Sequence, residues 1–476
     1  MLSTKVNKGF LWGILSGLFL IFISTLLISN VGQVFGLAII VLPFIIMYIS
    51  VVFKYPNFMG YSILFLSFFL FAINRYIVKD NFPVGTLVDM YVFFMYFVLL
   101  TKGLSVSVIW KRTLDAPLFI FLIWFLFCLC QLWNGYAPQG FYTWFNGVRP
   151  YLYLLLSVPL FCILLDHKSV NYFIVFWGVC SLILSIKGFV QLNIGLDSVE
   201  RVLIQGPMRS THLLWGQLRV FSLCSDAGIF GAIQGVSGIA FAIFFLQARN
   251  IKERIFLLLV SLAGVYGMFI SGTRGSLFIV LVGAFVYLIL VRRFKLLVLG
   301  AVCMSCFFVF MRYSDAGSGI YAIRRMRTAF NTEEDASFGA RYAKELKVRE
   351  YVADKPFGCG FGSMDIGLPD AVMPNLGTDS GFVALLGQQG IVGVILYIAM
   401  FFSFLLKGTY LVWFKIKNEW LRNILIGFIA GISGLIVAHY ANPIMQQHPV
   451  SYVIILGVAV IYSASRIDKE LTTKNE

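Results

Sequence analysis

Three arginines lie beside apolar segments of the chain, where their side chains could act on an anionic group. Arg219 precedes one apolar run, Arg274 lies in a short turn between two others, and Arg341 lies in the long hydrophilic stretch. A guanidinium binds phosphate or carboxylate through two parallel hydrogen bonds, which the ammonium group of lysine cannot do. We therefore expect a phosphate-bearing ligand at the membrane surface. The alternative is that each arginine forms an ordinary salt bridge with acids such as Glu345 and Glu350.

Other polar residues are candidates for proton transfer or for binding the same ligand. Asp379 stands just before an apolar run, so it could be a general base, or it could simply cap the helix that follows. His439 and His448 flank a short turn near the C-terminus and could supply a base instead, although a histidine at a helix end is more often structural. Arg149 and Arg209 could join the phosphate site.

The composition identifies the environment in which these side chains must be held. Hydrophobic residues make up 59% of the 476 residues and charged residues only 12%, and the mean hydropathy is +0.87. Soluble domains carry about 25% charged residues. An apolar content this high therefore indicates a lipid environment. The net charge of +15 does not indicate nucleic acid, because the basic residues lie in short loops between apolar runs.

The apolar runs predict an all-α polytopic membrane protein of about 12 to 14 transmembrane helices. Lys5 and Lys8 precede the first run, and no small-residue cleavage site ends it, so we expect a retained first helix. The predicted spans are 10–29, 32–53, 59–75, 84–101, 115–133, 150–165, 170–193, 226–247, 253–270, 275–292, 294–311, 380–406, 422–440 and 449–465.

The basic residues also predict the orientation. Every loop on one side carries lysine or arginine, which places that side and both termini in the cytoplasm. Arginine then predominates on the outer side and lysine on the inner side. We divide the chain into an N-terminal transmembrane bundle (1–193), a transmembrane region with an outer loop at 194–225 and the arginine turn near 274 (194–311), a large periplasmic loop with short helices (312–379), and C-terminal transmembrane helices (380–476). Within the large loop, we expect an amphipathic segment to open at Arg341.

Two cysteines fall in the predicted outer loops, Cys224 and Cys359, so a disulfide between them is one alternative. The other six lie inside apolar segments and have no spacing typical of metal ligands.

Four motifs occur in order along the outer segments: LRVFSLCSDAG at 218–228, ISGTRGS at 270–276, PFGCGFG at 356–362, and TDSGF at 378–382, which leads into LLGQQGIVG. Their order and spacing resemble those of the bacterial O-antigen ligase and polymerase superfamily, over roughly residues 200–400. Members of that superfamily are membrane glycosyltransferases that act on saccharides carried by undecaprenyl diphosphate.

The resemblance implies a GT-C-like fold in the bacterial inner membrane with a periplasmic active site. It implies that Arg219 and Arg274 contact the diphosphate, and that Arg341 lies in a loop closing over the sugar. The implied partners are an undecaprenyl-diphosphate-linked oligosaccharide, an acceptor glycan, the bilayer and a chain-length regulator, with no nucleic acid. No acidic pair of the DxD kind occurs on an outer loop, so we expect neither a metal nor another cofactor.

Three functions are compatible with these features. The first is a polymerase of lipid-linked repeat units, in O-antigen or exopolysaccharide synthesis. The second is a ligase that moves the finished glycan to a lipid core or a protein; ligases of the superfamily usually carry a histidine where this chain has Asp379 and Ser380, which favours the polymerase. The third is a polysaccharide flippase, although a transporter would show two similar halves.

Overall fold

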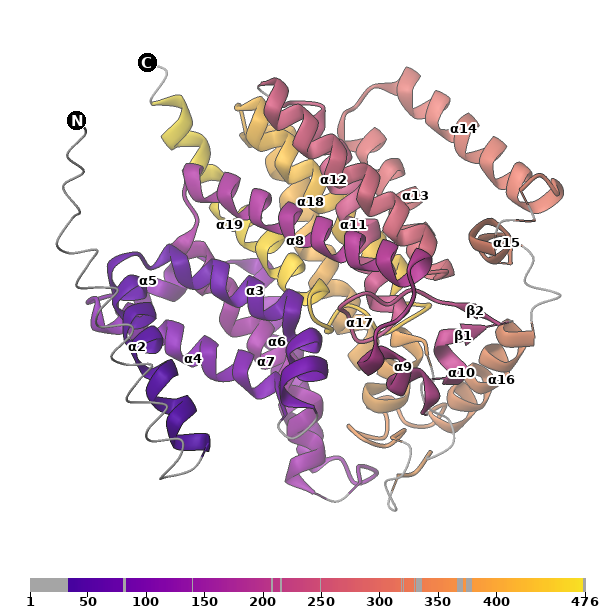
Figure 1. Ribbon diagram of the computed structural model, residues 1–476, viewed down its shortest axis with the longest axis horizontal. Coiled ribbons are helices and arrows are strands. Elements are labelled where there is room, and N and C mark those ends of the chain that lie inside the picture. The colour runs from indigo at the N-terminus through magenta and orange to yellow at the C-terminus, as the bar shows by residue number, and fades with distance from the viewer. Residues whose placement is uncertain are drawn as a thin grey trace, which may run out of the picture. The chain divides into compact units, whose positions relative to one another are not determined.

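A computed structural model of the chain (Figure 1) describes residues 33–473 apart from 80–82, 139, 207–208, 215, 249, 318, 320, 329, 331–335, 366–370 and 374–378. The predicted first span at 10–29, together with Lys5 and Lys8, lies outside the described residues. The chain divides into two compact units, residues 1–60 and 61–476.

The described part of the first unit is α2 (Gln33–Lys54) and the start of α3 (Asn57–Ile73). Several large apolar side chains of α2 are more than half exposed, among them Leu42 and Phe44. Exposed apolar side chains of this size fit a helix that faces lipid.

The second unit is almost entirely helical, which confirms the predicted fold class. The described part of the chain holds nine helices long and apolar enough to cross a membrane, and four shorter apolar helices. Beyond α3 the helices are α4 (Gly85–Thr101), α5 (Val106–Lys111), α6 (Ala116–Cys130), α7 (Phe141–Leu164), α8 (His167–Asn193), α9 (Ser198–Gln205), α10 (Arg209–His212), α11 (Ala227–Phe245), α12 (Ile251–Ile270), α13 (Arg274–Leu290), α14 (Phe294–Tyr313), α15 (Tyr321–Arg327), α16 (Ala336–Tyr351), α17 (Gly381–Tyr410), α18 (Glu419–Ala438) and α19 (Val450–Thr472). Short π-helices, η1 (Asn74–Val78) and η3 (Leu411–Lys415), continue α3 and α17, and a 3₁₀ turn, η2 (Gln131–Trp133), follows α6.

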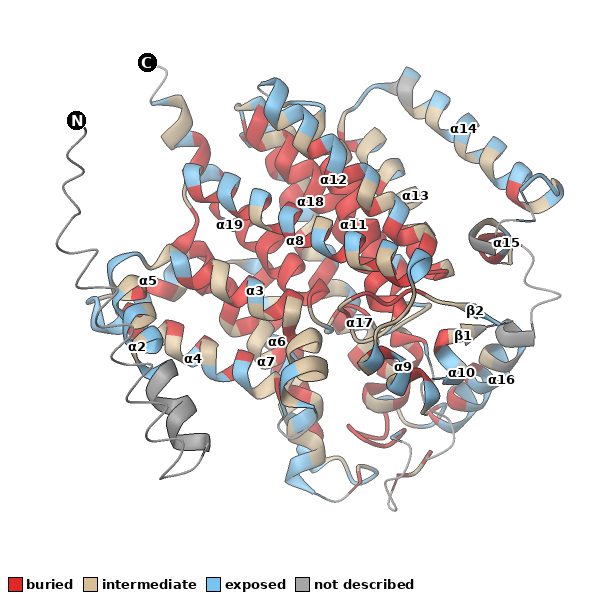
Figure 2. Ribbon diagram, in the orientation of Figure 1, coloured by how far each residue is buried: buried red, intermediate tan, exposed pale blue. Residues whose placement is uncertain are grey.

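Helix α11 forms the centre of this unit and packs against α12, α13 and α18 (Figure 2). Small residues allow the close approach: a Cβ added to Gly264 of α12 would lie 2.6 Å from the backbone nitrogen of Gly238 in α11. Interfaces of this kind hold membrane helices together by close packing, because lipid supplies no hydrophobic driving force between them. In contrast, α14 is largely exposed.

Two predicted boundaries need correction. The span predicted at 150–165 begins earlier, because α7 starts at Phe141 and continues through Pro150. A membrane helix tolerates an internal proline because neighbouring groups satisfy the freed carbonyl. The amphipathic segment predicted to open at Arg341 also starts earlier, since α16 begins at Ala336 and contains Arg341.

Candidate active site

The guanidinium of Arg219 is anchored on two segments of the chain. Strands β1 (Leu213–Leu214) and β2 (Gln217–Leu218) pair in a short antiparallel hairpin that ends just before it. The Nη1 group of Arg219 donates to the carbonyl of Thr211 at 2.9 Å, and Nη2 donates to Oγ1 of Thr273 at 3.1 Å. The hairpin and the arginine turn are therefore held together by this side chain.

The same threonine directly precedes Arg274, the first residue of α13. Gly272 adopts a left-handed conformation, with φ of 58°, and this lets the chain reverse tightly between α12 and α13. The Nη1 group of Arg274 lies 3.4 Å from both the carbonyl oxygen and Oγ1 of Thr328. The turn thus places Arg274 directly after Thr273, which binds Arg219. It also places the segment that follows α15 next to Arg274.

Four arginines gather at this point, and we call them the arginine group: Arg219, Arg274, Arg325 and Arg341. The charges of the other three all act on Arg274. Arg325 is only 8% exposed. Charges of one sign repel each other, and a buried one such as Arg325 is costly to desolvate unless an anion balances it. The arrangement is therefore suited to a multiply charged anion such as a diphosphate.

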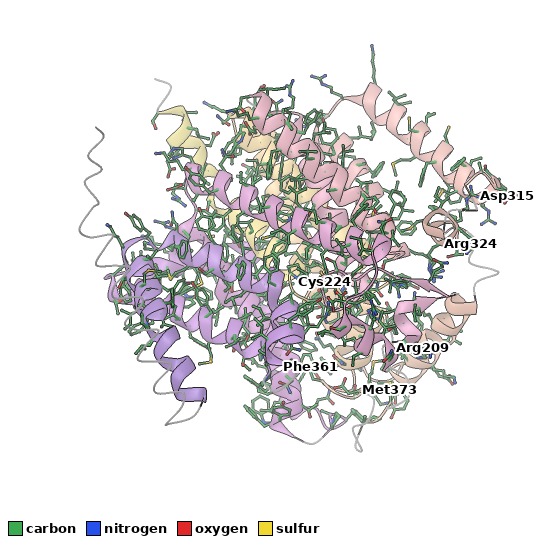
Figure 3. All side chains as sticks on the ribbon, viewed as in Figure 1. Arg209, Cys224, Asp315, Arg324, Phe361 and Met373 are labelled. Carbon is green, nitrogen blue, oxygen red and sulfur yellow. The ribbon has the colours of Figure 1, made fainter. Side chains whose placement is uncertain are left out.

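Sequence reasoning did not single out Arg325, although α15 carries a recognisable signal. This short helix has three arginines in its last four residues, Arg324, Arg325 and Arg327. Arg327 donates to the carbonyl of Ala316 within its own loop, whereas Arg324 is exposed (Figure 3). Only Arg325 of the three acts on Arg274, so tertiary contacts give these neighbours different roles.

Arg341 reaches from α16 to the start of α17. Its Nε and Nη2 groups donate to Oδ2 of Asp379 at 3.1 and 2.9 Å. Asp379 does not cap α17, because Ser380 takes that position and accepts from the backbone of Val383. A neighbouring contact also fixes α16, since the Tyr440 hydroxyl donates to the Glu345 carboxylate at 2.9 Å. Asp379 is therefore an exposed carboxylate held beside the arginine group.

His439 lies against the start of α17. Its imidazole is fully buried, and a Cβ added to Gly381 would lie 2.3 Å from Nε2 of the ring. The backbone of Gly381 also donates to the carbonyl of His439 at 2.9 Å. Burial lowers the pKa of His439 to about 4, so the ring is neutral at pH 7.

A glycine-rich loop covers the middle of α17. The backbone nitrogens of Cys359 and Gly360 donate to carbonyls of α17 at 2.9 and 2.7 Å, and α17 kinks at Gly390. Gly358 has φ of 70° and lies so close to α17 that a Cβ would approach the backbone nitrogen of Gly390 to 2.3 Å. Cys359 and Cys224 are both buried and free, so the disulfide alternative is wrong.

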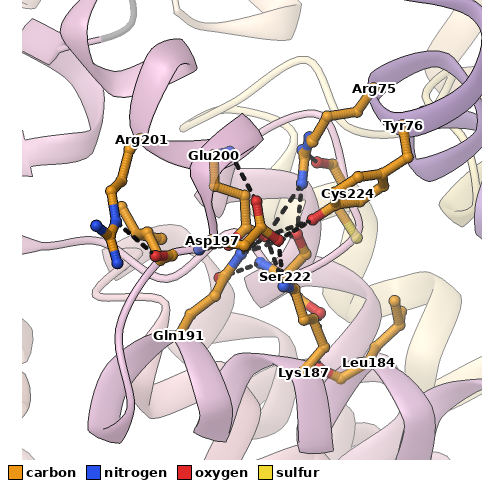
Figure 4. A network of polar contacts seen from close by, with 11 residues as sticks. Arg75, Tyr76, Leu184, Lys187, Gln191, Asp197, Glu200, Arg201, Ser222 and Cys224 are labelled. Atoms are coloured by element: carbon orange, nitrogen blue, oxygen red, sulfur yellow. Dashed lines mark hydrogen bonds and ion pairs between the residues drawn. The ribbon is translucent and has the colours of Figure 1, made fainter.

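A buried polar network supports the segment that carries Arg219 (Figure 4). Arg75 donates to the carbonyls of Ser222 and Cys224 at 2.9 and 2.7 Å. Gln191 donates to the same Ser222 carbonyl at 3.1 Å and accepts from its backbone nitrogen at 2.7 Å. These bonds hold Ser222 in a left-handed conformation that is uncommon for serine, with φ of 52°.

Glu200 and Asp197 supply the negative charge of this network. Glu200 is fully buried and lies 2.9 Å from Lys187 and 3.7 Å from Arg75. Asp197 accepts from the Tyr76 hydroxyl at 2.6 Å and from Lys187 at 3.0 Å. The network joins η1 and the C-terminal end of α8 to α9, so it fixes the loop from which Arg219 extends.

Two other predicted residues belong to a second polar cluster. Arg149, inside α7, pairs with Asp89 of α4 at 2.8 Å. His448 is in hydrogen-bond distance of Ser67, with Nδ1 and Oγ 3.0 Å apart, and the charge of Arg149 acts on it. Arg149 therefore neutralises a buried carboxylate. Arg209, in contrast, is exposed on α10 (Figure 3).

Comparison with known proteins identifies a family for part of the chain. Residues 258–398 match the family described as O-antigen ligase, which confirms the resemblance to the ligase and polymerase superfamily for that segment. The matched segment contains Arg274, Arg325, Arg341 and Asp379, but not Arg219. No curated protein matches the chain. The matched segment and the apolar helices together indicate a multi-pass bacterial membrane protein.

Proposed function

We propose that the protein is a polymerase of polysaccharide repeat units at the periplasmic face of the bacterial inner membrane. It would transfer a glycan from undecaprenyl diphosphate to a hydroxyl of an acceptor sugar. The O-antigen ligase family of residues 258–398 supports glycan transfer as the general activity. The observation that carries the proposal is the arginine group, in which Arg219 binds Thr273, the residue directly before Arg274, because guanidinium groups gathered in one place suit a diphosphate.

In the proposed transfer, the arginines would stabilise the leaving group, which is the lipid diphosphate. The acceptor oxygen attacks the anomeric carbon, the bond from that carbon to the diphosphate oxygen breaks, and the lipid diphosphate leaves with the electron pair. Arg274 and Arg219 would stabilise the charge that grows on this oxygen, since fixed donors need no reorganisation during the reaction. Arg325 would hold the second phosphate, and its burial would strengthen the interaction.

The acceptor hydroxyl must also lose a proton, and Asp379 would take it. In the structure Arg341 binds its carboxylate. A donor phosphate would compete for Arg341 and thereby release Asp379. The base would then become active only when donor is bound.

One observation favours a ligase as the second candidate. Ligases of the superfamily usually carry a histidine just before the helix that corresponds to α17, and this chain lacks it in sequence. The structure nevertheless places the ring of His439 against Gly381, at the start of that helix. The matched family is itself described as O-antigen ligase. In a ligase, His439 would replace the missing histidine as base.

A gene deletion separates the two candidates. Surface glycans from the deletion strain are resolved by gel after complementation with the wild-type chain or with Arg274→Ala. Loss of a polymerase leaves single repeat units attached to their target, whereas loss of a ligase leaves long chains unattached. An unchanged glycan profile would contradict both.

The proposal includes transfer without a metal ion. This part of the proposal rests on the sequence, in which no acidic pair of the DxD kind occurs on a predicted outer loop. We therefore expect the purified protein, reconstituted with lipid-linked repeat units, to retain its rate after treatment with EDTA. Loss of activity that added Mg²⁺ or Mn²⁺ restores would show that this part of the proposal is wrong.

A further inference from the structure

A polar cavity of about 510 Å³ lies at the end of α13 that is remote from Arg274. Because α13 has 17 residues, the two ends are about 26 Å apart. The cavity lies between the last turn of α13, the first turns of α18 and η3. It is thus distinct from the arginine group and independent of the function proposed above.

The charges around the cavity are mainly positive. Arg292, Arg293 and Arg422 line it, and Glu419 is its one acidic lining residue. Glu419 lies 3.5 Å from Arg422, so it neutralises part of that charge only. Arg292 and Arg293 are both exposed, and the polar side chains of Gln247 and Tyr287 complete the wall. A cavity of this composition favours an anion.

Arg292 is positioned before any ligand arrives. Its guanidinium lies 4.3 Å from the ring centroid of Trp413, which in turn donates its indole N–H to the carbonyl of Leu290 at 3.1 Å. The backbone of Arg292 is left-handed, with φ of 57°, a conformation that costs energy for an arginine. Trp413 belongs to η3, and π-helical segments are frequent at functional sites. The strained backbone and the stacked ring together hold the guanidinium at the cavity wall.

We propose that this cavity binds a phosphate group, carried either by the headgroup of an anionic phospholipid or by a free ion. The cavity lies where apolar helices end, and the ends of membrane-spanning helices lie near lipid headgroups. Arginine offers phosphate two parallel hydrogen bonds, and a guanidinium already stacked on an aromatic ring loses little freedom on binding. The adjacent Arg293 supplies a second charge to the same ligand.

The test uses the full chain in phosphatidylcholine nanodiscs, with phosphatidylglycerol and inorganic phosphate as probes. Native mass spectrometry counts the phosphatidylglycerol molecules that each variant retains. We expect about fivefold weaker retention for each charge removed in Arg292→Ala and in the double variant Arg292→Ala/Arg293→Ala. Arg292→Lys should also bind weakly, because it keeps the charge but loses the fork and the stacking. This variant makes the test independent of any folding defect in the alanine variants.

Arg254→Ala is the matched control. Arg254 is exposed near the start of α12 and lies 5.7 Å from the ring of Phe245, but it does not line the cavity. The Arg254→Ala variant should retain phosphatidylglycerol as the wild type does. Retention of phosphatidylglycerol against excess phosphate supports the lipid, and displacement by phosphate supports the free ion. Wild-type retention in the double variant, an equal loss in Arg254→Ala, or binding of neither probe would overturn the proposal.

Discussion

Arg341 binds Asp379 through two nitrogens on one carboxylate oxygen, at 2.9 and 3.1 Å, and so joins α16 to the start of α17. Both side chains remain partly exposed, at 39% and 64%. Exposed ion pairs contribute only about 0–1 kcal/mol, so this pair costs little to break. Under the proposed function, a donor diphosphate would displace the carboxylate and so link donor binding to the availability of a base.

Arg274→Ala should reduce glycan transfer by about 100-fold or more, because it removes a fixed cation from the leaving group. Arg274→Lys should be almost as damaging, since an ammonium group cannot form the bidentate contact. The measurement is product length on gels with reconstituted protein and a lipid-linked donor. Arg201→Ala is the control, because Arg201 is an exposed arginine that donates to the carbonyl of Leu196. Wild-type polymer in Arg274→Ala would remove this residue from the site.

Asp379→Asn should abolish transfer but leave donor binding close to that of the wild type. Arg341→Ala should weaken donor binding instead, because its guanidinium would contact phosphate in the complex. Donor affinity and single-turnover rate, measured separately, distinguish the two effects. If the pair is only structural, the exchanged variant Arg341→Asp/Asp379→Arg should recover activity. We expect that it does not.

Glu200→Gln should destabilise the chain by about 3–5 kcal/mol, because it leaves Arg75 without its buried counter-charge and Lys187 with only the more exposed Asp197. The carbonyls of Ser222 and Cys224 would then be held less firmly, so donor affinity should fall as well. Thermal unfolding in detergent measures the first effect and donor titration the second. Glu350→Gln, at an exposed glutamate of α16, should change neither. Equal stability of the two variants would contradict the role of the network.

Asp197→Asn should destabilise the chain in a pH-dependent way. Burial alone would raise the pKa of Asp197, but hydrogen bonds from Tyr76, the backbone of Glu200 and Lys187 outweigh it and lower the pKa to about 2. Because the folded pKa is lowered, the stabilisation is present above the unfolded pKa of about 3.9 and is lost as the pH falls toward 2. Asparagine still caps α9, so the substitution isolates the charge.

The check for Asp197 compares unfolding midpoints of the wild type and the variant at neutral pH and at a pH of about 3. The difference between the two proteins should be largest at neutral pH and smaller in acid. A difference that stays the same at both values would mean that the variant acts through packing and not through charge.

Gly381→Ala should destabilise the start of α17 by about 1–3 kcal/mol, because the new methyl group would lie 2.3 Å from the ring of His439. His439→Ala removes that ring, so the two substitutions should not be additive. The cost of Gly381→Ala should be smaller in the His439→Ala background than in the wild type, as measured by thermal unfolding. Additive effects would show that the two residues do not contact each other.

The sequence by itself determined the helices and the chemistry available at their ends. Apolar runs long enough for a bilayer predicted helices such as α8 and α13 within a few residues, because the backbone in lipid has few other ways to satisfy its polar groups. The preference for arginine over lysine in the outer segments indicated phosphate. Where a helix depends on tertiary support, as α7 does at Pro150, the sequence placed its start too late.

Only the tertiary structure decided which charges act together. Arg219 and Arg274 are far apart in sequence, yet Arg219 binds Thr273, the residue directly before Arg274, and Arg325 joins them whereas Arg327 does not. Arg149 is also an arginine and was predicted to lie on the same side of the membrane as the arginine group, but it pairs with Asp89. The reason is physical: residue type fixes what a side chain can bind, whereas the packing of helices distant in sequence fixes which partner lies within hydrogen-bond distance.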